Sequence, residues 1–270
     1  MLFAERRGGV LVATLARAPV NALDAELLAR IDAVITDAEV DDSVSVLHIR
    51  SAHEVFCAGA DLALMRECIA RPSGAEAMVA VVQTMQRVFA RLEAAPFVAL
   101  AEIAGAAVGG GLELVLACDL RVAALDARFA FPEVSLGLVP AAGGTQRLTA
   151  LCGPAIARRL ILGGEVVDGA AAERIGLVQW AQPADALAPW TAALAARLAA
   201  YPRAALAAGK HCIALAAAGS KDGFAAEIAA TRERYADPQT LQRVGAFLAR
   251  DAHAAVQSNP SPDPGTRSVS

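Results

Sequence analysis

The first two-thirds of the chain alternates short, nearly continuous apolar segments with longer segments of helical periodicity, and the remainder is almost wholly helical in pattern. The segments GGVLVATLA, SVSVLHIRSA and FVALAEIAG are typical of strands, whereas NALDAELLARIDAVITDAEVDD places its apolar residues on one helical face. Such strands separated by helices predict βαβ units and a largely parallel sheet. Further helices are predicted over 75–92, 185–199, 203–217 and 223–236. The sequence therefore predicts an α/β fold followed by a helical C-terminal region.

The charge and the cysteine content argue against several functions and locations for a chain of this fold. The net charge is −4 with both signs spread along the chain, which argues against a nucleic-acid-binding surface. The five cysteines are scattered without CxxC spacing, a pattern typical of reduced thiols in a cytoplasmic protein. Charged residues from Glu5 onward interrupt any signal-peptide pattern, and no uncharged apolar run is long enough for a membrane span.

Two glycine-containing turns each link a strand to a helix. The first is VFCAGADLALM, residues 55–65, and the second is GAAVGGGLELVLACD, residues 105–119. Glycine lets a ligand approach the backbone, and free N–H groups at a helix start can bind an anion or a developing oxyanion. One such turn is more readily explained by close packing of helix on sheet, but two in one α/β core favour a functional site. The motifs GxxxxGK[ST], GxGxxG and GxSxG are absent, which argues against a phosphate loop or a serine nucleophile.

Within and beside these turns, four side chains have an expected role. We expect Cys57 to be a small packed side chain and Asp61 to cap the helix that follows it. Glu113 lies in the first turn of the apolar helix LELVLAC, and Glu133 follows a proline where the strand RFAF ends. Burial among apolar residues raises the pKa of a carboxyl group towards the range useful for acid–base catalysis. The plainer alternatives are an exposed glutamate at the helix start and an ordinary loop glutamate.

Four segments together resemble the enoyl-CoA hydratase/isomerase (crotonase) superfamily. They are PVNALDAELL, FCAGADL, GAAVGGGLELVLACDLRVA and FAFPEVSLGLVPAAGGTQRL, which stand in the family's order and spacing. The resemblance covers residues 11–251. It implies a crotonase-like spiral of ββα units over residues 1–200 and a helical trimerisation region over 201–256. Residues 257–270, which are rich in serine and proline, are predicted to form a disordered tail.

The resemblance also implies a reaction and its residues. It assigns an oxyanion hole to the backbone N–H groups of Ala60 and Gly110, and the catalytic carboxyl groups of a hydratase to Glu113 and Glu133. These would add water across the α,β double bond of an unsaturated acyl-CoA thioester. The acyl-CoA-binding positions implied by the motifs are Ala18, Pro19, Ala58, Ala60, Asp61, Leu62, Gly109, Gly110, Pro132 and Leu136. No separate cofactor is implied, because coenzyme A is part of the substrate.

The implied partners are therefore an acyl-CoA substrate and other copies of the chain, as a homotrimer or a dimer of trimers in the cytoplasm. No metal site is expected, since the four histidines, His48, His53, His211 and His253, are dispersed. His48 is expected to pack in the core or at its edge, and Lys210 to be solvated.

Two departures from the family pattern affect the substrate. Ala63 stands where many relatives have a polar contact to coenzyme A, which leaves Arg17 or Arg66 to replace it. Ala141 replaces a glycine in PAAGGTQRL. The alternatives to hydration are double-bond isomerisation, dienoyl-CoA hydration, decarboxylation, or a non-catalytic protein that binds acyl-CoA or RNA. The presence of both glutamates favours the hydratase.

Overall fold

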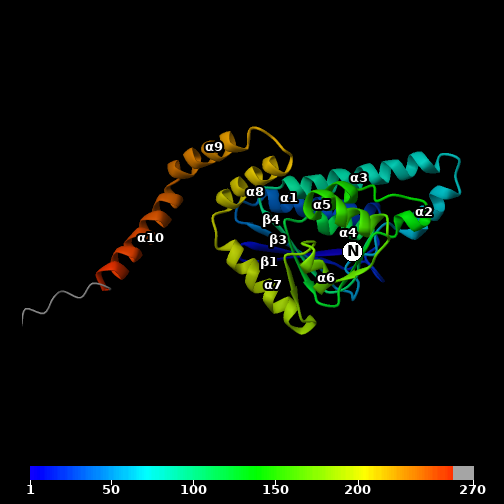
Figure 1. The fold of residues 1–270 in the computed structure, drawn as a ribbon, viewed down its shortest axis with the longest axis horizontal. Coiled ribbons are helices and arrows are strands. Elements are labelled where there is room, and N and C mark those ends of the chain that lie inside the picture. Colours follow the sequence, from blue (N-terminus) through cyan, green and yellow to red (C-terminus); the bar gives the residue numbers. More distant parts are fainter. Residues whose placement is uncertain (258–270) are drawn as a thin grey trace, which may run out of the picture.

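The computed structural model describes the backbone of residues 1–257 and the side chains of residues 1–249 (Figure 1). Its main sheet has six strands in the order β1-β2-β3-β4-β6-β9. The strands are β1 Leu2–Arg7, β2 Val10–Leu15, β3 Val46–Ser51, β4 Val98–Ile103, β6 Leu120–Ala124 and β9 Trp180–Gln182. All neighbours from β2 to β9 pair in parallel, which confirms the predicted parallel sheet.

Strand β1 was not among the predicted elements. It pairs antiparallel with β2, from Leu2 opposite Leu15 to Arg7 opposite Val10, and most of its residues are exposed. An edge strand that faces solvent carries charged side chains and lacks apolar alternation. The glutamate and arginines of LFAERR therefore gave no strand signal, although they close one edge of the sheet.

Helices cover both faces of this sheet, and the last two extend away from it (Figure 1). The helices are α1 Ala25–Val40, α2 Leu62–Ile69, α3 Gly74–Ala94, α4 Gly110–Leu116, α5 Gly144–Ile161, α6 Gly169–Arg174, α7 Ala184–Ala199, α8 Arg203–Ala217, α9 Gly223–Ala236 and α10 Pro238–Gln257. In Figure 1, α7 lies on the opposite side of the strands from α1 and α3. Phe56, Phe89, Phe97, Phe129 and Phe131 are fully buried in the hydrophobic core. The fold is the predicted mixed α/β arrangement with a helical C-terminal region.

A second, small sheet carries the segments that matter for function. It consists of β5 Ala107–Val108, β7 Arg128–Ala130 and β8 Val167–Asp168. Strands β5 and β7 are parallel, so the chain leaves both at the same end of the sheet. The glycine cluster follows β5, and a 3₁₀ helix over Glu133–Leu136 follows β7 closely.

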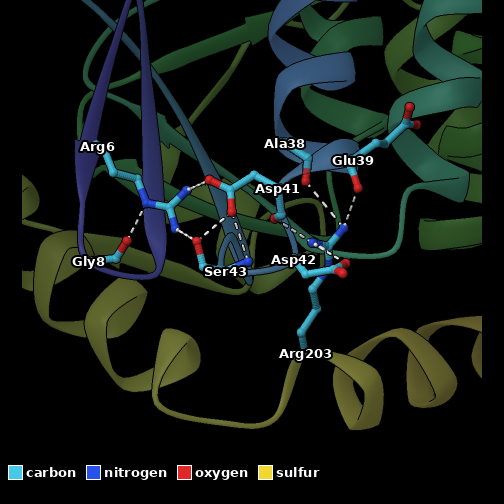
Figure 2. A network of polar contacts seen from close by, with 8 residues as sticks. All are labelled: Arg6, Gly8, Ala38, Glu39, Asp41, Asp42, Ser43 and Arg203. Carbon is cyan, nitrogen blue, oxygen red and sulfur yellow. Dashed lines mark hydrogen bonds and ion pairs between the residues drawn. The ribbon is translucent and has the colours of Figure 1, made fainter.

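Polar contacts help to hold the start of α8 to this core. None of the residues of α8 or α9 is buried, and α9 and α10 extend away from the sheet (Figure 1). Arg203, the first residue of α8, donates hydrogen bonds to the carbonyl oxygens of Ala38 and Glu39 at the end of α1 (Figure 2). On the same network, Arg6 pairs with Asp41 at 2.7 Å. The boundary expected near residue 200 stays a prediction, and the tail expected beyond Gln257 lies outside the described residues.

One expectation about this region is wrong. Lys210 is not solvated: its Nζ atom lies 2.7 Å from Oδ2 of Asp119 and donates to the carbonyl oxygens of Leu92 and Phe97 at 3.3 and 3.1 Å. The Leu92 carbonyl belongs to the last turn of α3, where it also accepts a hydrogen bond from the N–H of Ala95 at 3.4 Å. Lys210 therefore fastens α8 to the end of α3. His48, in contrast, is buried as expected, with Nε2 3.1 Å from Oε2 of Glu102.

Candidate active site

Three chain segments that are distant in sequence run side by side at one end of the small sheet. Cys57 bridges Ala107 in parallel, with Val108 N–H donating to the carbonyl oxygen of Cys57 at 3.0 Å. Ala107 in turn pairs in parallel with Phe129. Because all three segments run in the same direction, the residues that follow them meet at one place. These are the first glycine turn, the glycine cluster and the Pro132–Glu133 corner.

The two glycine turns lie in direct contact. A Cβ atom added at Gly59 would lie 2.8 Å from the carbonyl oxygen of Val108 and 3.0 Å from the nitrogen of Gly110. Among the described residues, neither the N–H of Ala60 nor that of Gly110 donates a hydrogen bond to the protein. Gly110 is the first residue of α4, where a free N–H group is expected. The packing of Gly59 therefore brings two unbonded N–H groups close together.

Helix α4 carries Glu113 on its first turn, and the whole helix is buried. Oε1 of Glu113 accepts a hydrogen bond from the N–H of Gly144, the first residue of α5, at 2.8 Å. Burial is the largest effect on this carboxyl group and, with the nearby Glu133 carboxyl, raises its pKa from 4.5 to about 7. Hydrogen bonds from the backbone of Gly144 and Ala142 oppose that rise in pKa. Of the two alternatives for Glu113, the structure shows the buried glutamate with a raised pKa.

Glu133 lies across the glycine cluster from the first turn. The N–H of Gly109 donates to the carbonyl oxygen of Ala130 at 3.0 Å, which joins β7 to the cluster. A Cβ atom at Gly109 would lie only 2.7 Å from Oε1 of Glu133, so this carboxyl group packs against the glycine backbone. Burial raises the pKa of Glu133. Its Oε2 atom is buried and accepts no hydrogen bond from any described residue.

Asp61 caps α2 as predicted. Its Oδ1 atom accepts hydrogen bonds from the N–H groups of Ala63 and Leu64 at 2.7 and 3.2 Å. Its Oδ2 atom pairs with Arg17 at 2.6 Å, and Arg17 also pairs with Asp24 at 2.8 Å. Arg17 therefore has two carboxylate partners within the chain. Arg66, on the exposed side of α2, is the better candidate to replace the missing polar contact at Ala63.

The other expected substrate-binding positions surround these groups. Ala18 and Pro19 are exposed and lie beside the first turn, because Ala58 N–H donates to the carbonyl oxygen of Val20 at 3.0 Å. Leu62 and Leu136 are 65% and 64% exposed despite being apolar, while Pro132 is partly buried next to Glu133. The structure thus gathers the expected residues around one site. A groove of about 680 Å³ lies elsewhere, between the end of α1 and the start of α8.

Two features of the site were not predicted from the sequence. Asn21 is fully buried with a positive φ of 53°, and its Nδ2 donates to the carbonyl oxygen of Phe56 at 2.9 Å and to Oγ of Ser51 at 2.8 Å. It thereby fixes the base of the first turn. The backbone of Ala142 and Gly144, which bonds Glu113, was also not anticipated. The segment PVNAL could have indicated that Asn21 is buried and hydrogen-bonded. Asn21 stands among apolar residues, and a polar side chain is buried there only when it is hydrogen-bonded.

This set of groups suits acid–base chemistry on a carbonyl compound. Unbonded N–H groups can stabilise negative charge on an oxygen, and buried carboxyl groups of raised pKa can move protons near neutral pH. Within the described residues, no group of three or more potential metal ligands is present. No described helix is long and apolar enough to cross a membrane.

Comparison with known proteins identifies the family. The sequence matches the enoyl-CoA hydratase/isomerase family over residues 5–240. It is 36% identical to the 2,3-dehydroadipyl-CoA hydratase of Escherichia coli over 78% of this chain and 81% of that protein. It is 35% identical to the crotonyl-CoA hydratase of Syntrophomonas wolfei over 77% of this chain and 76% of that one.

Solved structures agree with these matches. The enoyl-CoA hydratase of Bacillus anthracis superposes with a TM-score of 0.86 at 29% identity, covering 92% of this chain and 96% of that chain. DspI of Pseudomonas aeruginosa superposes with a TM-score of 0.85 at 32% identity, covering 92% and 94%. The chain belongs to the enoyl-CoA hydratase/isomerase family, which is a family of enzymes.

Proposed function

We propose that the protein is an enoyl-CoA hydratase, a hydro-lyase that adds water across the α,β double bond of an unsaturated acyl-CoA thioester. One observation carries the proposal. The carboxyl groups of Glu113 and Glu133, close enough for Glu133 to raise the pKa of Glu113, lie beside the paired N–H groups of Ala60 and Gly110. Relatives named as hydratases of crotonyl-CoA and dehydroadipyl-CoA support the same reaction.

The N–H groups of Ala60 and Gly110 would form the oxyanion hole. When water adds to the β-carbon, electron density moves through the double bond onto the thioester oxygen, which becomes an enolate. Two fixed N–H donors stabilise that charge without reorganising. Gly59 and Gly109 would serve by letting the two turns and the Glu133 carboxyl group pack closely, because an added Cβ atom would meet Gly110 at the first position and Glu133 at the second.

The two glutamates would handle the protons. One carboxylate accepts a proton from water as its oxygen bonds to the β-carbon, and a carboxyl group then donates a proton to the α-carbon, so that water is added in full. A pKa of about 7 lets Glu113 occur in both protonation states near neutral pH. The unbonded Oε2 of Glu133 is a buried acceptor directed at no protein group, which suits a bond to the reacting water.

The remaining expected residues would hold the thioester. Ala18, Pro19 and Ala58 would contact coenzyme A through the backbone, with Arg66 as its cation. The exposed apolar side chains of Leu62 and Leu136 would contact the acyl group, because apolar surface at a site mouth is usually covered by ligand. Asp61 and Pro132 would act by shaping the two turns. No cofactor would be required apart from the coenzyme A of the substrate.

We further propose that the protein assembles as a homotrimer or a dimer of trimers in the cytoplasm. Helices α8 and α9 bury none of their residues in the single chain, and Ile213, Phe224 and Ile228 are 62–82% exposed. Apolar surface of this kind is typical of contact between copies. Five free cysteines suit a reducing compartment. Sedimentation of the purified protein would test the assembly.

Turnover of crotonyl-CoA, followed by loss of the enoyl-thioester absorbance, tests the function. Glu113→Gln and Glu133→Gln should each lose most activity while keeping their affinity for coenzyme A esters. Analysis of the product by NMR in heavy water separates hydration from isomerisation. A folded protein that hydrates no enoyl-CoA of any chain length would overturn the proposal.

A further inference from the structure

Residues 141–144 (the 141–144 loop) comprise the end of the segment that joins the 3₁₀ helix to α5 and the first residue of α5, and they pack against Glu113. A Cβ atom added at Gly144 would lie 3.0 Å from Cγ of Glu113 and 2.9 Å from the ring of Phe131. Gly144 N–H donates to Oε1 of Glu113 at 2.8 Å, and the backbone of Ala142 bonds the same carboxyl group. The orientation of these peptide units therefore decides how Glu113 is held.

Two side chains hold the loop from its other side. Nε2 of Gln86, on α3, donates to the carbonyl oxygen of Ala141 at 2.6 Å. Nη1 of Arg147, on α5, donates to the carbonyl oxygen of Ala142 at 3.0 Å. The guanidinium of Arg147 is in turn held by Glu93 of α3, whose Oε2 accepts from Nη2 and Nε at 2.9 and 3.1 Å. Gln86 and Glu93 are seven residues apart, so they project from one face of α3.

The planarity of the peptide bond connects these contacts to Glu113. In a trans peptide unit the carbonyl group and the N–H of the next residue point in opposite directions. Holding the Ala141 carbonyl towards Gln86 therefore directs the N–H of Ala142 away from α3, towards Glu113. Holding the Ala142 carbonyl towards Arg147 fixes the next peptide unit, which joins the unit that carries the Ala142 N–H to the unit that carries the Gly144 N–H.

We propose that Gln86 and the Glu93–Arg147 pair are positioning residues for the hydration reaction, which hold the 141–144 loop so that its N–H groups bind the Glu113 carboxylate. The inference rests on the proposed function where it predicts a change in reaction rate. Its prediction for the pKa of Glu113 does not depend on that function. Hydrogen bonds to a carboxylate favour its charged form. The nearby Glu133 carboxyl group raises the pKa of Glu113, and the guanidinium of Arg147 lowers it. Hydrogen bonds from the loop N–H groups lower the pKa further. A loosened loop therefore raises the pKa of Glu113.

The first test replaces Gln86 by leucine, which has a similar size and no donor. Gln86 is exposed, so we expect the fold to be retained. Loss of one hydrogen bond that aligns a reacting group predicts a fall in kcat of about tenfold, with KM within about twofold. The pH–rate profile of the parent protein should contain a limb that reports the ionisation of Glu113 and that disappears in Glu113→Gln. In Gln86→Leu this limb should move to higher pH.

Arg87→Leu is the matched control. Arg87 is the neighbouring residue on α3, but its guanidinium bonds Asp32 of α1 at 3.1 Å and has no bond to the loop. This variant should keep both the rate and the pH profile of the parent protein. Glu93→Ala, which releases Arg147, should act in the same direction as Gln86→Leu, whereas Glu93→Gln should recover part of the rate because it retains an acceptor.

A second readout does not depend on turnover. The pKa of the Glu113 carboxyl carbon can be followed by ¹³C NMR, with its signal identified by its loss in Glu113→Gln. If the parent protein hydrates no enoyl-CoA but Gln86→Leu raises this pKa, the positioning role stands and the proposed function fails. An unchanged pKa in both Gln86→Leu and Glu93→Ala would overturn the positioning role, even if kcat fell, because the loss would then be merely structural.

Discussion

The Cα atom of Gly59 packs against the backbone nitrogen of Gly110, so closely that a methyl group on Gly59 would lie 3.0 Å from that nitrogen. Gly59 also has a φ of +88°, which side chains with a Cβ rarely adopt. This contact joins two turns that are about 50 residues apart along the chain. It is the reason that the N–H groups of Ala60 and Gly110 lie near each other.

Gly59→Ala should therefore separate the two N–H groups. Loss of one oxyanion-hole donor costs on the order of a hundredfold in kcat, and we expect a fall of that size for crotonyl-CoA hydration. Gly176→Ala is a matched control for strain alone, because Gly176 has a φ of +78° with no atom within 4 Å of an added Cβ. Unchanged kcat in Gly59→Ala would remove this contact from catalysis.

Gly109→Ala should displace the Glu133 carboxyl group. The added Cβ would lie 2.7 Å from Oε1 of Glu133, closer than a non-bonded contact allows. We expect kcat to fall at least about tenfold while the fold is kept, since misplacing a proton-transfer group costs this much or more. Gly219→Ala, with a φ of +66° and open space around it, is the control. Steady-state kinetics of both variants would measure the difference, and equal rates would contradict the prediction.

The pKa of Glu113 predicts how stability depends on pH. A pKa raised from 4.5 to about 7 means that folding favours the neutral acid. Its contribution to stability is therefore fully present below about pH 4.5 and is lost as the pH rises through about 7. The difference between these two pKa values corresponds to a free energy of about 3 kcal/mol. Relative to the parent protein, Glu113→Gln should gain about this much free energy of unfolding between about pH 5 and about pH 8.

Chemical denaturation of both proteins at the two pH values measures that change. Glu165→Gln is a suitable control, because this glutamate is exposed and its Arg159 partner lowers its pKa. A stability difference between Glu113→Gln and the parent that does not vary with pH would show that Glu113 ionises normally.

Lys210→Met should destabilise the fold. Lys210 and Asp119 are only 13% and 23% exposed, and removing the cation leaves the carboxylate with the Ala99 N–H as a partner. Breaking a largely buried ion pair in this way costs about 3 kcal/mol. The pKa of Asp119 is already raised by burial, which shows that its charged form depends on its partners.

Two further variants sharpen the measurement of unfolding free energy. Asp119→Asn in the Lys210→Met background should recover part of the loss, because no buried charge then remains. Arg159→Gln should cost much less than Lys210→Met, since Arg159 and Glu165 are 44% and 41% exposed and solvent weakens their attraction. Equal costs for Lys210→Met and Arg159→Gln would show that the Lys210 pair is effectively solvated.

The sequence by itself determined the alternation of strands and helices and the Asp61 cap, whereas it left the burial of Glu113 open. The alternation and the cap each depend on a few neighbouring residues, since a cap, an apolar face and a glycine turn are local properties of the backbone. The family motifs added the spacing of Ala60, Gly110, Glu113 and Glu133.

Only the tertiary structure decided which of these groups meet. The parallel course of three segments brings the glycine turns to Glu133, and the 141–144 loop supplies the N–H groups that hold Glu113. The edge strand β1 and the buried contacts of Lys210 were misjudged for the same reason. The identity of a charged residue does not show whether its side chain contacts water or a carbonyl group of another helix. The path of the folded chain decides between the two, because hydrogen bonds and burial depend on distance in space and not on distance in sequence.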